Sequence, residues 1–576
     1  MKRWGFVGLV AMVACAPENT SYTDAQGGAC PGVSAGMLEA APQALGDVPG
    51  GRDADGRESF IVRYRDDGVS AASRVHRLGG RVTATYSSVP AVAARLTEQE
   101  RHELAKDSRV ESIEPDQVWH SLGPSRLPAL AFAGAATRGS VSGEYTDGVR
   151  RVQANEVWDT NGDGLPEPEQ ATGRGVKVCI IDSGLDLQHP ELKDAVVAGR
   201  DFLDGDDAPG DGSPGAWGSG HGTHVAGIIA ARPGGGGRGG NVLVSGRGVV
   251  GVAPEAQLVI ARVLDVHGRT QMSLVLEALE YCASQGAKVA SLSLGGGFAS
   301  RTTLQAFRAA YESGMLVVAA SGNDGGRLVS YPASDPSVLS VGAVDAQDRR
   351  ADFSAGGDGL ALVAPGVDVL STFPTGHGAF STLDVRDTQP LSRSLLYGPS
   401  GAQNRTLVDC GGAETKDSCA GSTCNGFIAY VRPGRVPIDQ AMVNVMMQGA
   451  TAVIFVNEVT EGGVEILSLP QRGHWVPAIT VNQAGSTVLH GMLTYSVRVK
   501  VEPTDYAYMS GTSMATPHVS AVAALLFSAR PSATPGQVRS AMLTTALDLG
   551  TAGYDEGYGH GLVQAKKALE ALSKLP

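Results

Sequence analysis

Short apolar runs alternate with helix-like stretches over residues 175–372 of the 576-residue chain. The runs are β-branched or Leu-rich, which is typical of parallel strands that are covered on both faces. The order strand, helix, strand therefore predicts a doubly wound, mostly parallel α/β sheet, with ligands at the carboxyl ends of its strands. Strands are predicted at residues 176–181, 258–263, 289–294, 316–320 and 338–341, and helices at 221–231, 272–284 and 303–313.

Residues 58–120 have a different pattern, in which alternating apolar positions and two helical stretches follow one another closely. Thr97 followed three residues later by Glu100 is typical of a helix capping box. We expect a small α+β, ferredoxin-like domain. Its predicted strands are 60–64, 81–86, 91–96 and 110–113, and its predicted helices are 71–78 and 97–106.

Residues 376–503 do not continue the core pattern and are interpreted as a β-rich domain inserted into a larger one. Their predicted elements are strands at 426–431, 452–457 and 476–481 and a helix at 436–448. The large domain is then split into residues 149–375 and 504–576, and its first helix is expected at 152–158.

The first residues indicate export. Lys2 and Arg3 precede an apolar run at 6–14, which suits a signal peptide over residues 1–15 but is too short to span a bilayer. The run ends in Met-Val-Ala-Cys, which resembles a bacterial lipobox and implies lipidation of Cys15; the alternative is ordinary cleavage after an alanine. Residues 16–57 are rich in Gly, Ala, Pro and Asp and are predicted to be a flexible tether.

The amino-acid composition and net charge indicate which classes of protein and partner suit the chain. With 42% hydrophobic and 18% charged residues the chain suits a soluble globular protein, and its net charge of −13 argues against a nucleic-acid partner. We expect a monomer that meets a membrane only through the lipid anchor. Cys179 and Cys282 are predicted to be buried thiols. One disulfide is expected among Cys410, Cys419 and Cys424, whose pairing stays open and which lack a fourth zinc ligand.

Candidate chemistry begins at Ser513, in a turn that leads into the Ala-rich stretch 519–527. The amino end of a helix favours an anion beside the serine Oγ, although a lone serine there is most often only a helix cap. Serine Oγ needs a base to become a nucleophile. Asp182, in the sequence Ile-Ile-Asp-Ser-Gly, and His221, in Gly-His-Gly-Thr-His, offer a carboxylate and an imidazole; His224 is equally placed by spacing alone.

The segments DSG, HGTHVAG and GTSMATPHV, in this order, resemble those of the subtilisin-like serine proteases (peptidase S8). A fourth segment, AASGND at 319–324, is similar to the oxyanion segment of that family. The resemblance implies that Ser513 is the nucleophile, His221 the base and Asp182 its partner, with Asn323 donating to the oxyanion and His224 structural. No cofactor is required for this chemistry.

The same resemblance implies a substrate cleft for proteins or peptides. Residues 268–272 match the strand that pairs with an extended substrate. The small, uncharged pocket walls imply broad specificity, with a preference for apolar or aromatic side chains before the scissile bond. The implied substrate-binding residues are Gly268, Met272, Val275, Ser293, Leu294, Gly295, Ala320, Ser321, Gly322 and Ser330.

Two further segments resemble accessory domains. Residues 58–120, with Gly-Gly-Arg-Val at 79–82, are similar to the inhibitor-type (I9) propeptide, which implies an intramolecular inhibitor whose tail at 114–120 blocks the cleft. Maturation is then expected within or just before the linker at 121–148; an unrelated ferredoxin-like binding domain is the alternative. Residues 449–457 and 476–479 resemble a protease-associated (PA) domain, which controls access or contacts substrate.

Structural calcium is expected at two places. Asp159, Asn161 and Asp163 alternate as oxygen ligands, with glycine at the sixth position of the loop as in a calcium loop. Gln170 stands where a bidentate glutamate is expected, so an Asx-rich turn is the alternative. Glu191 matches a position that often ligates calcium in the family.

Together these features predict an endopeptidase made as a self-inhibited, autoprocessed precursor, either secreted or lipid-anchored at the bacterial surface or outer membrane. One alternative is a surface binding or adhesion protein whose catalytic domain is silent. A lipase-like hydrolase is the other alternative, but Gly-Thr-Ser-Met-Ala lacks the G-x-S-x-G pattern of such enzymes.

Overall fold

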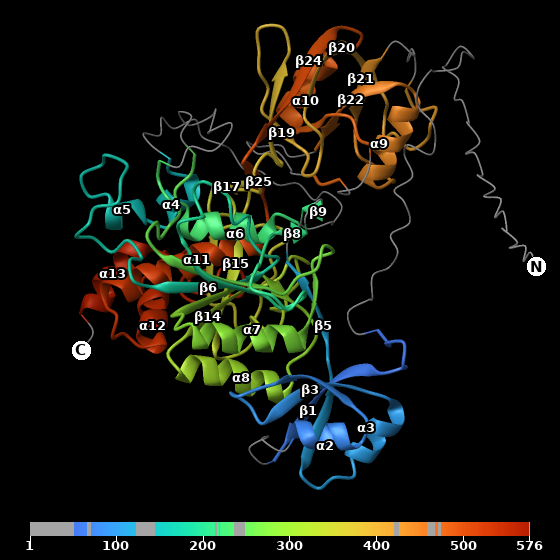
Figure 1. Cartoon of the computed structure of the whole chain (residues 1–576). Helices are drawn as coiled ribbons and strands as arrows, with labels where there is room; N and C mark the ends of the chain where they lie inside the picture. Colours follow the sequence, from blue (N-terminus) through green and yellow to red (C-terminus); the bar gives the residue numbers. More distant parts are fainter. Residues whose placement is uncertain are drawn as a thin grey trace, which may run out of the picture.

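The chain forms three units, which follow one another in space from one end of the molecule to the other (Figure 1). The N-terminal unit (residues 51–122, blue) lies at one end, and the inserted unit (376–503, orange) lies at the other. The central unit (144–375 and 504–574) lies between them. This computed structural model describes residues 51–65, 71–122, 144–213, 216–217, 219–234, 248–419, 426–457, 467–469 and 474–574. The predicted signal peptide, Cys15 and most of the predicted tether lie outside these residues.

A seven-stranded parallel sheet in the order β16-β15-β14-β12-β6-β10-β7 forms the centre of the molecule. This confirms the predicted doubly wound α/β fold. The strand order reverses beside β6, which is where ligands bind in such sheets. The sheet strands are β6 (Lys177–Asp182), β7 (Val196–Asp201), β10 (Gln257–Arg262), β12 (Val289–Leu292), β14 (Leu316–Ala320), β15 (Val338–Val344) and β16 (Leu362–Pro365).

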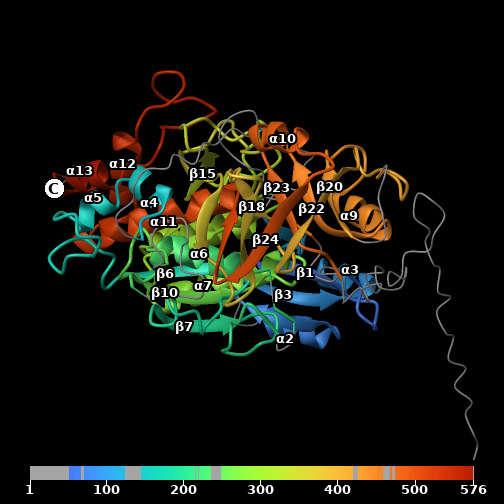
Figure 2. The same cartoon turned by 90° about the horizontal axis from the view of Figure 1, so that it is seen from above.

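Helices cover both faces of this sheet. Val178 and Ile180 pack in one core cluster with α6 and α11, whereas Cys179 and Ile181 pack in another with α7 and α8, as expected for alternate residues of a strand. In Figure 2 the C-terminal helices α12 and α13 lie at the opposite end from the inserted unit. The helices are α6 (His221–Ala230), α7 (Met272–Ser284), α8 (Arg301–Glu312), α11 (Thr512–Ala529), α12 (Pro535–Thr545) and α13 (Ala565–Ser573).

The helix predicted at 152–158 is wrong. The structure has two short helices there, α4 (Asp147–Arg151) and α5 (Asn155–Trp158). Between them Gln153 has a φ of 59°. A right-handed helix cannot continue through a left-handed residue, so the chain turns at this point.

The N-terminal unit is a four-stranded antiparallel sheet in the order β2-β3-β1-β4, with α2 and α3. The capping box of Thr97 and Glu100 is present. Two boundaries need correction, because Arg57 of the predicted tether pairs with Glu100 at 3.1 Å and β5 continues past residue 120. The elements are β1 (Glu58–Tyr64), α2 (Ala71–Arg77), β2 (Arg81–Thr85), β3 (Ala91–Leu96), α3 (Glu98–Leu104), β4 (Val110–Pro115) and β5 (Val118–Ser121).

The inserted unit has its own seven-stranded sheet, in the order β18-β24-β20-β21-β22-β23-β19. A ribbon of two antiparallel strands, β17 (Val369–Thr372) and β25 (Tyr506–Met509), joins it to the central unit. Its elements are β18 (Gly378–Asp384), β19 (Ser392–Ser394), β20 (Gly401–Asp409), β21 (Phe427–Val431), α9 (Ile438–Met447), β22 (Ala450–Val456), β23 (Ala478–Val481), α10 (Gln483–His490) and β24 (Ser496–Thr504).

The structure contains two disulfides among the residues it describes. Cys410 pairs with Cys419, which confirms the predicted bond in this loop; Cys424 lies outside the described residues. Cys179 and Cys282, predicted as free thiols, form the other bond, with their Cα atoms 5.7 Å apart. That prediction failed because the sequence does not show that β6 turns Cys179 toward the face of the sheet that α7 covers.

We expect the Cys179–Cys282 bond to stabilise the protein more than the Cys410–Cys419 bond does. The first closes a loop of 103 residues and the second a loop of 9 residues. Loop-closure entropy gives about 4–5 kcal/mol for the long loop and roughly half as much for the short one. Chemical unfolding of the two double Cys→Ala variants measures both losses, and a larger loss for the short loop would contradict this order.

Candidate functional site

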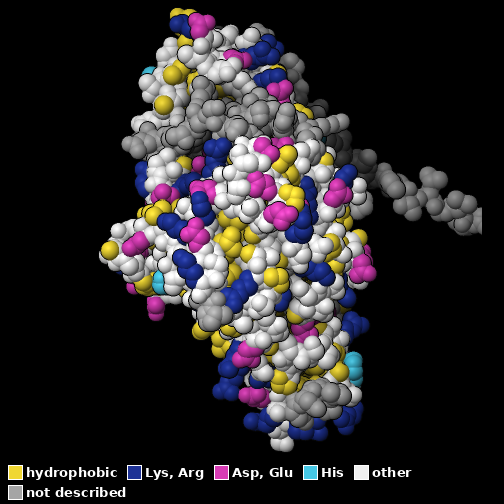
Figure 3. All heavy atoms as spheres, turned by 90° about the vertical axis from the view of Figure 1, so that its left-hand side faces the viewer, with side chains coloured by type: hydrophobic (Ala, Val, Ile, Leu, Met, Phe, Trp, Pro, Cys, Tyr) yellow, Lys and Arg dark blue, Asp and Glu magenta, His cyan; other side chains and the backbone are white. Residues whose placement is uncertain are grey.

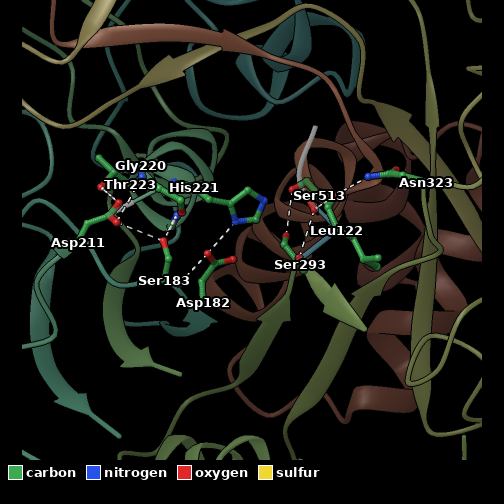
Figure 4. A network of polar contacts seen from close by, with 12 residues as sticks. Leu122, Asp182, Ser183, Asp211, Gly220, His221, Thr223, Ser293, Asn323 and Ser513 are labelled. Carbon is green, nitrogen blue, oxygen red and sulfur yellow. Dashed lines mark hydrogen bonds and ion pairs between the residues drawn. The ribbon is translucent and has the colours of Figure 1, made fainter. Parts of the chain in front are cut away.

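Asp182 and His221 form a buried hydrogen bond at the point where the strand order reverses. Asp182 is the last residue of β6 and His221 the first of α6, and their Oδ1 and Nδ1 atoms lie 2.7 Å apart. The two residues are 1% and 2% exposed. In Figure 4 the imidazole lies between Asp182 and Ser513, the second residue of α11. His221 Nε2 has no hydrogen-bond partner among the described residues and can therefore serve Ser513.

A glycine makes this close approach possible. Gly222 follows His221 directly, and a Cβ atom on it would lie 2.1 Å from the carbonyl oxygen of Gly184. Any side chain there would push the start of α6 away from the turn that follows Asp182. The close contact with Gly184 is thus the physical reason for a glycine directly after His221.

Asp211 is a buried residue of the site that the sequence reasoning missed. Its carboxylate accepts hydrogen bonds from Thr223 Oγ1 at 2.9 Å, the Gly220 N–H at 3.3 Å and Ser183 Oγ at 3.4 Å. These partners flank His221 and follow Asp182, so Asp211 ties the two segments together (Figure 4). The sequence offered no motif for it, because it lies in a Gly-rich stretch ten residues before His221.

The carboxylates control the protonation of His221. Burial lowers the pKa of His221, but the charge and hydrogen bond of Asp182, together with the charge of Asp211, outweigh burial and raise it above its ordinary value. Burial raises the pKa of Asp211 itself to about 7, against the bonds from Thr223 and Gly220. The site therefore stabilises an imidazolium, as a general base requires.

The other two histidines near the site are structural. His224 Nε2 lies 3.1 Å from the carbonyl oxygens of both Val369 and Ala507, and burial lowers its pKa to about 3. His518 Nδ1 donates to the Met514 carbonyl at 2.8 Å, and burial lowers its pKa to about 4. Both rings therefore bond backbone carbonyls in the core, whereas His221 bonds Asp182.

Asn323 has its amide orientation fixed by the neighbour of Ser513. Its Oδ1 accepts bonds from the backbone N–H and Oγ1 of Thr512, each at 2.9 Å. The Nδ2 group is thereby turned toward the Leu122 carbonyl oxygen, to which it donates. Ser513 Oγ donates to the same oxygen. Thr512 is thus a second residue that sequence reasoning missed, although it lies within the recognised segment.

The tail of the N-terminal unit runs through this site as an added strand. β5 pairs antiparallel with β11 (Arg269–Gln271) on one side and with β13 (Leu294–Gly295) on the other. The Ser121 N–H donates to the Gly268 carbonyl at 2.7 Å, and the Leu122 N–H donates to the Ser293 carbonyl at 3.0 Å. The strand predicted to pair with substrate thus pairs with the chain's own tail.

The side chains of the tail occupy two apolar places. A Cβ atom on Gly295 would lie 3.4 Å from Leu122 Cδ1, so Gly295 walls the space that Leu122 fills. Trp119 is fully buried, packs edge-on against Tyr331 at 5.7 Å and belongs to the same core cluster as several predicted pocket residues. Those residues are Met272, Val275 and Leu294.

The remaining predicted pocket residues lie beside Asn323. The Gly322 N–H donates to Thr512 Oγ1 at 3.3 Å, and the Ser330 N–H donates to the Ser321 carbonyl at 2.8 Å. Ala320 ends β14 directly before them. These residues support the loop that carries the Asn323 amide.

The predicted calcium residues fall in two separate places. Asp163 Oδ1 accepts the Leu165 N–H at 2.9 Å, and the Asn161 amide donates to Asp163 at 3.1 Å, as in an Asx-rich turn. Within the described residues no three His, Cys, Asp or Glu side chains are grouped as a metal site. Asp159 Oδ1 is nevertheless buried without a hydrogen-bond partner among the described residues, so this loop has an oxygen to offer a cation.

Glu191 lies fully buried among backbone and tyrosine donors. It accepts from Tyr506 Oη at 2.8 Å and from the Val249 N–H at 3.2 Å, while its Oε2 has no partner in the described part of the chain. Burial and the charges of Glu144 and Asp505 raise its pKa to about 8, against those two bonds. Oε2 is thus the one oxygen of Glu191 that is left to accept a further partner among the described residues.

On the face shown in Figure 3, acidic and basic side chains are interspersed. Among the described helices, none combines the length and the apolar character that crossing a membrane requires.

Comparisons with known proteins agree with this geometry. The subtilase family model matches residues 173–402 and 448–561, and the peptidase inhibitor I9 model matches residues 66–121. Subtilisin E of Bacillus subtilis (strain 168) is 35% identical over 334 residues, which are 56% of this chain and 76% of that protein.

Two solved structures share the fold. The psychrophilic subtilisin-like protease Apa1 from the Antarctic psychrotroph Pseudoalteromonas sp. AS-11 is 30% identical, with a TM-score of 0.52, over 74% of this chain and 97% of Apa1. Fervidolysin from Fervidobacterium pennivorans, a keratinolytic enzyme, has a TM-score of 0.55 at 23% identity over 89% of this chain and 61% of that one, which supports the fold alone. The chain therefore belongs to the subtilase family and is a subtilisin-like serine endopeptidase with an I9-type propeptide.

Proposed function

We propose that the chain is an exported endopeptidase precursor that cleaves itself after Leu122. The observation that carries this proposal is the Leu122 carbonyl, which accepts hydrogen bonds from Ser513 Oγ and Asn323 Nδ2 at the end of a strand seated in the cleft. A peptide about to be cleaved presents its scissile carbonyl oxygen to the oxyanion donor, as Leu122 does to Asn323, and keeps its carbonyl group beside the serine. The bond to Gly123 is then the maturation site, just inside the predicted linker at 121–148.

In this proposal each residue of the site has one role. Ser513 Oγ attacks the carbonyl carbon while His221 Nε2 takes its proton and later returns it to the leaving amine. Asp182 holds the imidazole in the tautomer with Nδ1–H and stabilises the imidazolium. The Asn323 amide and the Ser513 backbone N–H stabilise the oxyanion, and the acyl-enzyme is released by water.

We expect wild-type protein to lose everything up to Leu122, while Ser513→Ala keeps it, because the variant lacks the nucleophile. Intact mass and N-terminal sequencing after purification measure this, with Gly123 as the expected new N-terminus. Leu122→Asp is the matched control, since a carboxylate in the uncharged pocket should slow the same cut. Unaided maturation of Ser513→Ala would rule out self-cleavage, and a cut elsewhere would rule out Leu122.

The proposed specificity follows from the tail. Leu122 fills the place before the scissile bond beside Gly295, which supports a broad preference for apolar or aromatic side chains there. Trp119, three residues upstream, supports a second apolar pocket that accepts an aromatic ring. Protein or peptide substrates would replace the tail strand between β11 and β13.

We expect kcat/KM to rise with pH as His221 loses its proton, and to fall as pH decreases through its raised pKa. Because Asp182 and Asp211 raise that pKa, removing either charge should move the acidic limb to lower pH. Asp182→Asn should also reduce kcat by about 10⁴-fold, because the imidazole is then no longer held in the tautomer with Nδ1–H. Asp211→Asn should reduce kcat far less. pH–rate profiles of the mature enzyme on a peptide anilide measure both the position of the acidic limb and kcat. An acidic limb that moves to higher pH in either variant would contradict the assignment.

We also propose structural calcium, which is not needed for the chemistry. Glu191 would hold one ion, where its unpartnered Oε2 lies near Glu144. Asp159, Asn161 and Asp163 would hold another through side-chain oxygens. Bound calcium would cancel the repulsion of buried carboxylates and so favour the folded state.

Calcium should therefore raise the melting temperature of the Ser513→Ala protein, and EGTA should reverse the rise. Glu191→Gln and the Asp159→Asn, Asp163→Asn double variant should each lose part of the shift, and Asp417→Asn, on the inserted unit, should keep it. Calorimetric titration with CaCl₂ counts the ions, and an identical shift in all variants would remove both sites.

Localisation and domain identity complete the proposal. The N-terminal signal and Cys15 support export, either free or with a lipid anchor at the bacterial surface or outer membrane. The segments that resemble a PA domain, 449–457 and 476–479, fall on β22 and β23, which supports our assignment of the inserted unit to that class. We expect the mature enzyme to be a monomer.

A further inference from the structure

Two side chains of the inserted unit reach the loops that carry His221 and Ser513. Arg393 lies in β19 and is 6% exposed, and Tyr397 follows the strand. We propose that Arg393 and Tyr397 are positioning residues, through which the inserted unit holds the serine and histidine loops in their reactive arrangement. This inference rests on the roles proposed above for His221 and Ser513.

Arg393 is held by contacts that depend on its planar shape. Its Nε and Nη2 donate to the two carboxylate oxygens of Asp368, at 3.0 and 2.7 Å. Its guanidinium carbon lies 3.9 Å from the centre of the Tyr508 ring. A bidentate pair combined with stacking fixes orientation as well as distance, and lysine cannot reproduce it.

These partners belong to the ribbon that leads to the nucleophile. Asp368 directly precedes β17, and its N–H donates to Ser510 Oγ at 2.9 Å. Tyr508 lies in β25, the strand that ends just before the turn into α11 and Ser513. Arg393 therefore contacts the residue before β17 and a residue of β25, close to that turn.

Tyr397 makes the corresponding contact on the histidine side. Its hydroxyl donates to the Ser219 carbonyl at 2.7 Å. Ser219 Oγ in turn accepts the backbone N–H of His221 at 3.2 Å. Two hydrogen bonds therefore connect the inserted unit to the backbone of the general base.

The backbone at both contacts is left-handed. Asp368 has a φ of 53° and Tyr397 a φ of 63°. Left-handed residues other than glycine are uncommon, and a bulky one such as tyrosine is an outlier that the surroundings must hold in place. These two sit at the seam between the units, where their conformation aims one side chain at Arg393 and the other at Ser219.

A shift of about 1 Å between reacting groups can cost about 10²-fold in rate, so contacts remote from the substrate can control turnover. Within the described part of the chain, the bonds given above for Arg393 and Tyr397 end on Asp368 and on the Ser219 carbonyl, and none of these reaches the tail strand. Losing them should therefore reduce kcat and leave KM nearly unchanged. A purely structural seam would reduce stability without this division.

The test compares Arg393→Met and Tyr397→Phe with matched controls in the same unit. Arg432 Nη2 donates to both carboxylate oxygens of Asp409, at 2.8 and 3.0 Å, and the guanidinium lies over the Tyr430 ring, far from the ribbon in sequence. Tyr430 Oη shares a hydrogen bond with Ser486 at 2.6 Å. Arg432→Met and Tyr430→Phe therefore remove an Arg–Asp pair and a tyrosine hydroxyl bond of the same unit without touching the loops.

Four quantities are measured on mature protein: kcat and KM on a peptide anilide, the rate at which phenylmethylsulfonyl fluoride labels Ser513, and the melting temperature. We expect kcat and the labelling rate to fall by about tenfold in Arg393→Met and about threefold in Tyr397→Phe, with KM within twofold of wild type and controls unchanged. Arg393→Lys should rescue Arg393→Met only partly. Adding Asp368→Asn to Arg393→Met should cause little further loss, because the two residues act as a pair.

Several results would overturn the inference. Unchanged kcat and labelling in Tyr397→Phe and Arg393→Lys would do so, even if Arg393→Met failed to fold. Equal losses in the Arg432 and Tyr430 controls would also do so, since the effect would then be general destabilisation. Wild-type protein that fails to react at Ser513 would instead refute the catalytic assignment itself, and that result is distinguishable because it precedes any comparison of variants.

Discussion

The buried hydrogen bond between Asp182 and His221 constrains the rest of the structure. Removing a carboxylate from water is costly unless donors replace the lost solvation. Here the Ser183 N–H at 2.7 Å and the imidazole both donate to Asp182 Oδ1, whereas Oδ2 has no partner among the described residues. Both segments must therefore arrive in one register. The sheet delivers Asp182 at the end of β6, and Asp211 ties the turn before His221 to the residue after Asp182.

The tail of the N-terminal unit contacts Ser513 and Asn323, the groups that the proposed catalysis needs. Its tail strand satisfies the edges of β11 and β13, so the cleft is closed by backbone pairing rather than by a special inhibitor side chain. Asp116 adds a second hold, because its carboxylate accepts the Ser273 N–H at 2.9 Å near the start of α7. Glu280 of that helix accepts the backbone N–H groups of Ser87 and Ser88 at 2.8 and 2.6 Å. Cutting after Leu122 would break the covalent link yet leave these contacts, which explains how a cleaved tail would still inhibit.

Much of the central fold could be predicted because its signal is local. The apolar run at 316–320 and the helix at 272–284 have the predicted bounds, and the resemblance drew Asp182, His221 and Ser513 from distant segments. The predictions failed where a residue's role depends on a contact with another segment of the chain. The pairing of Cys179 with Cys282 depends on which face of the sheet each residue meets, and Asp211 acquires its role only when its loop folds against the start of α6.

The place of the insertion follows from the geometry of the ribbon. β17 and β25 are antiparallel neighbours, so a domain added between them can extend their pairing through β18 and β24 without disturbing the parallel sheet. The same continuity makes the inserted unit part of the path into α11. A domain attached there by a flexible linker could not affect Ser513. A domain attached by paired strands can shift the residues that precede Ser513. The contact of Arg393 with Asp368 lies on this path, because Asp368 directly precedes β17.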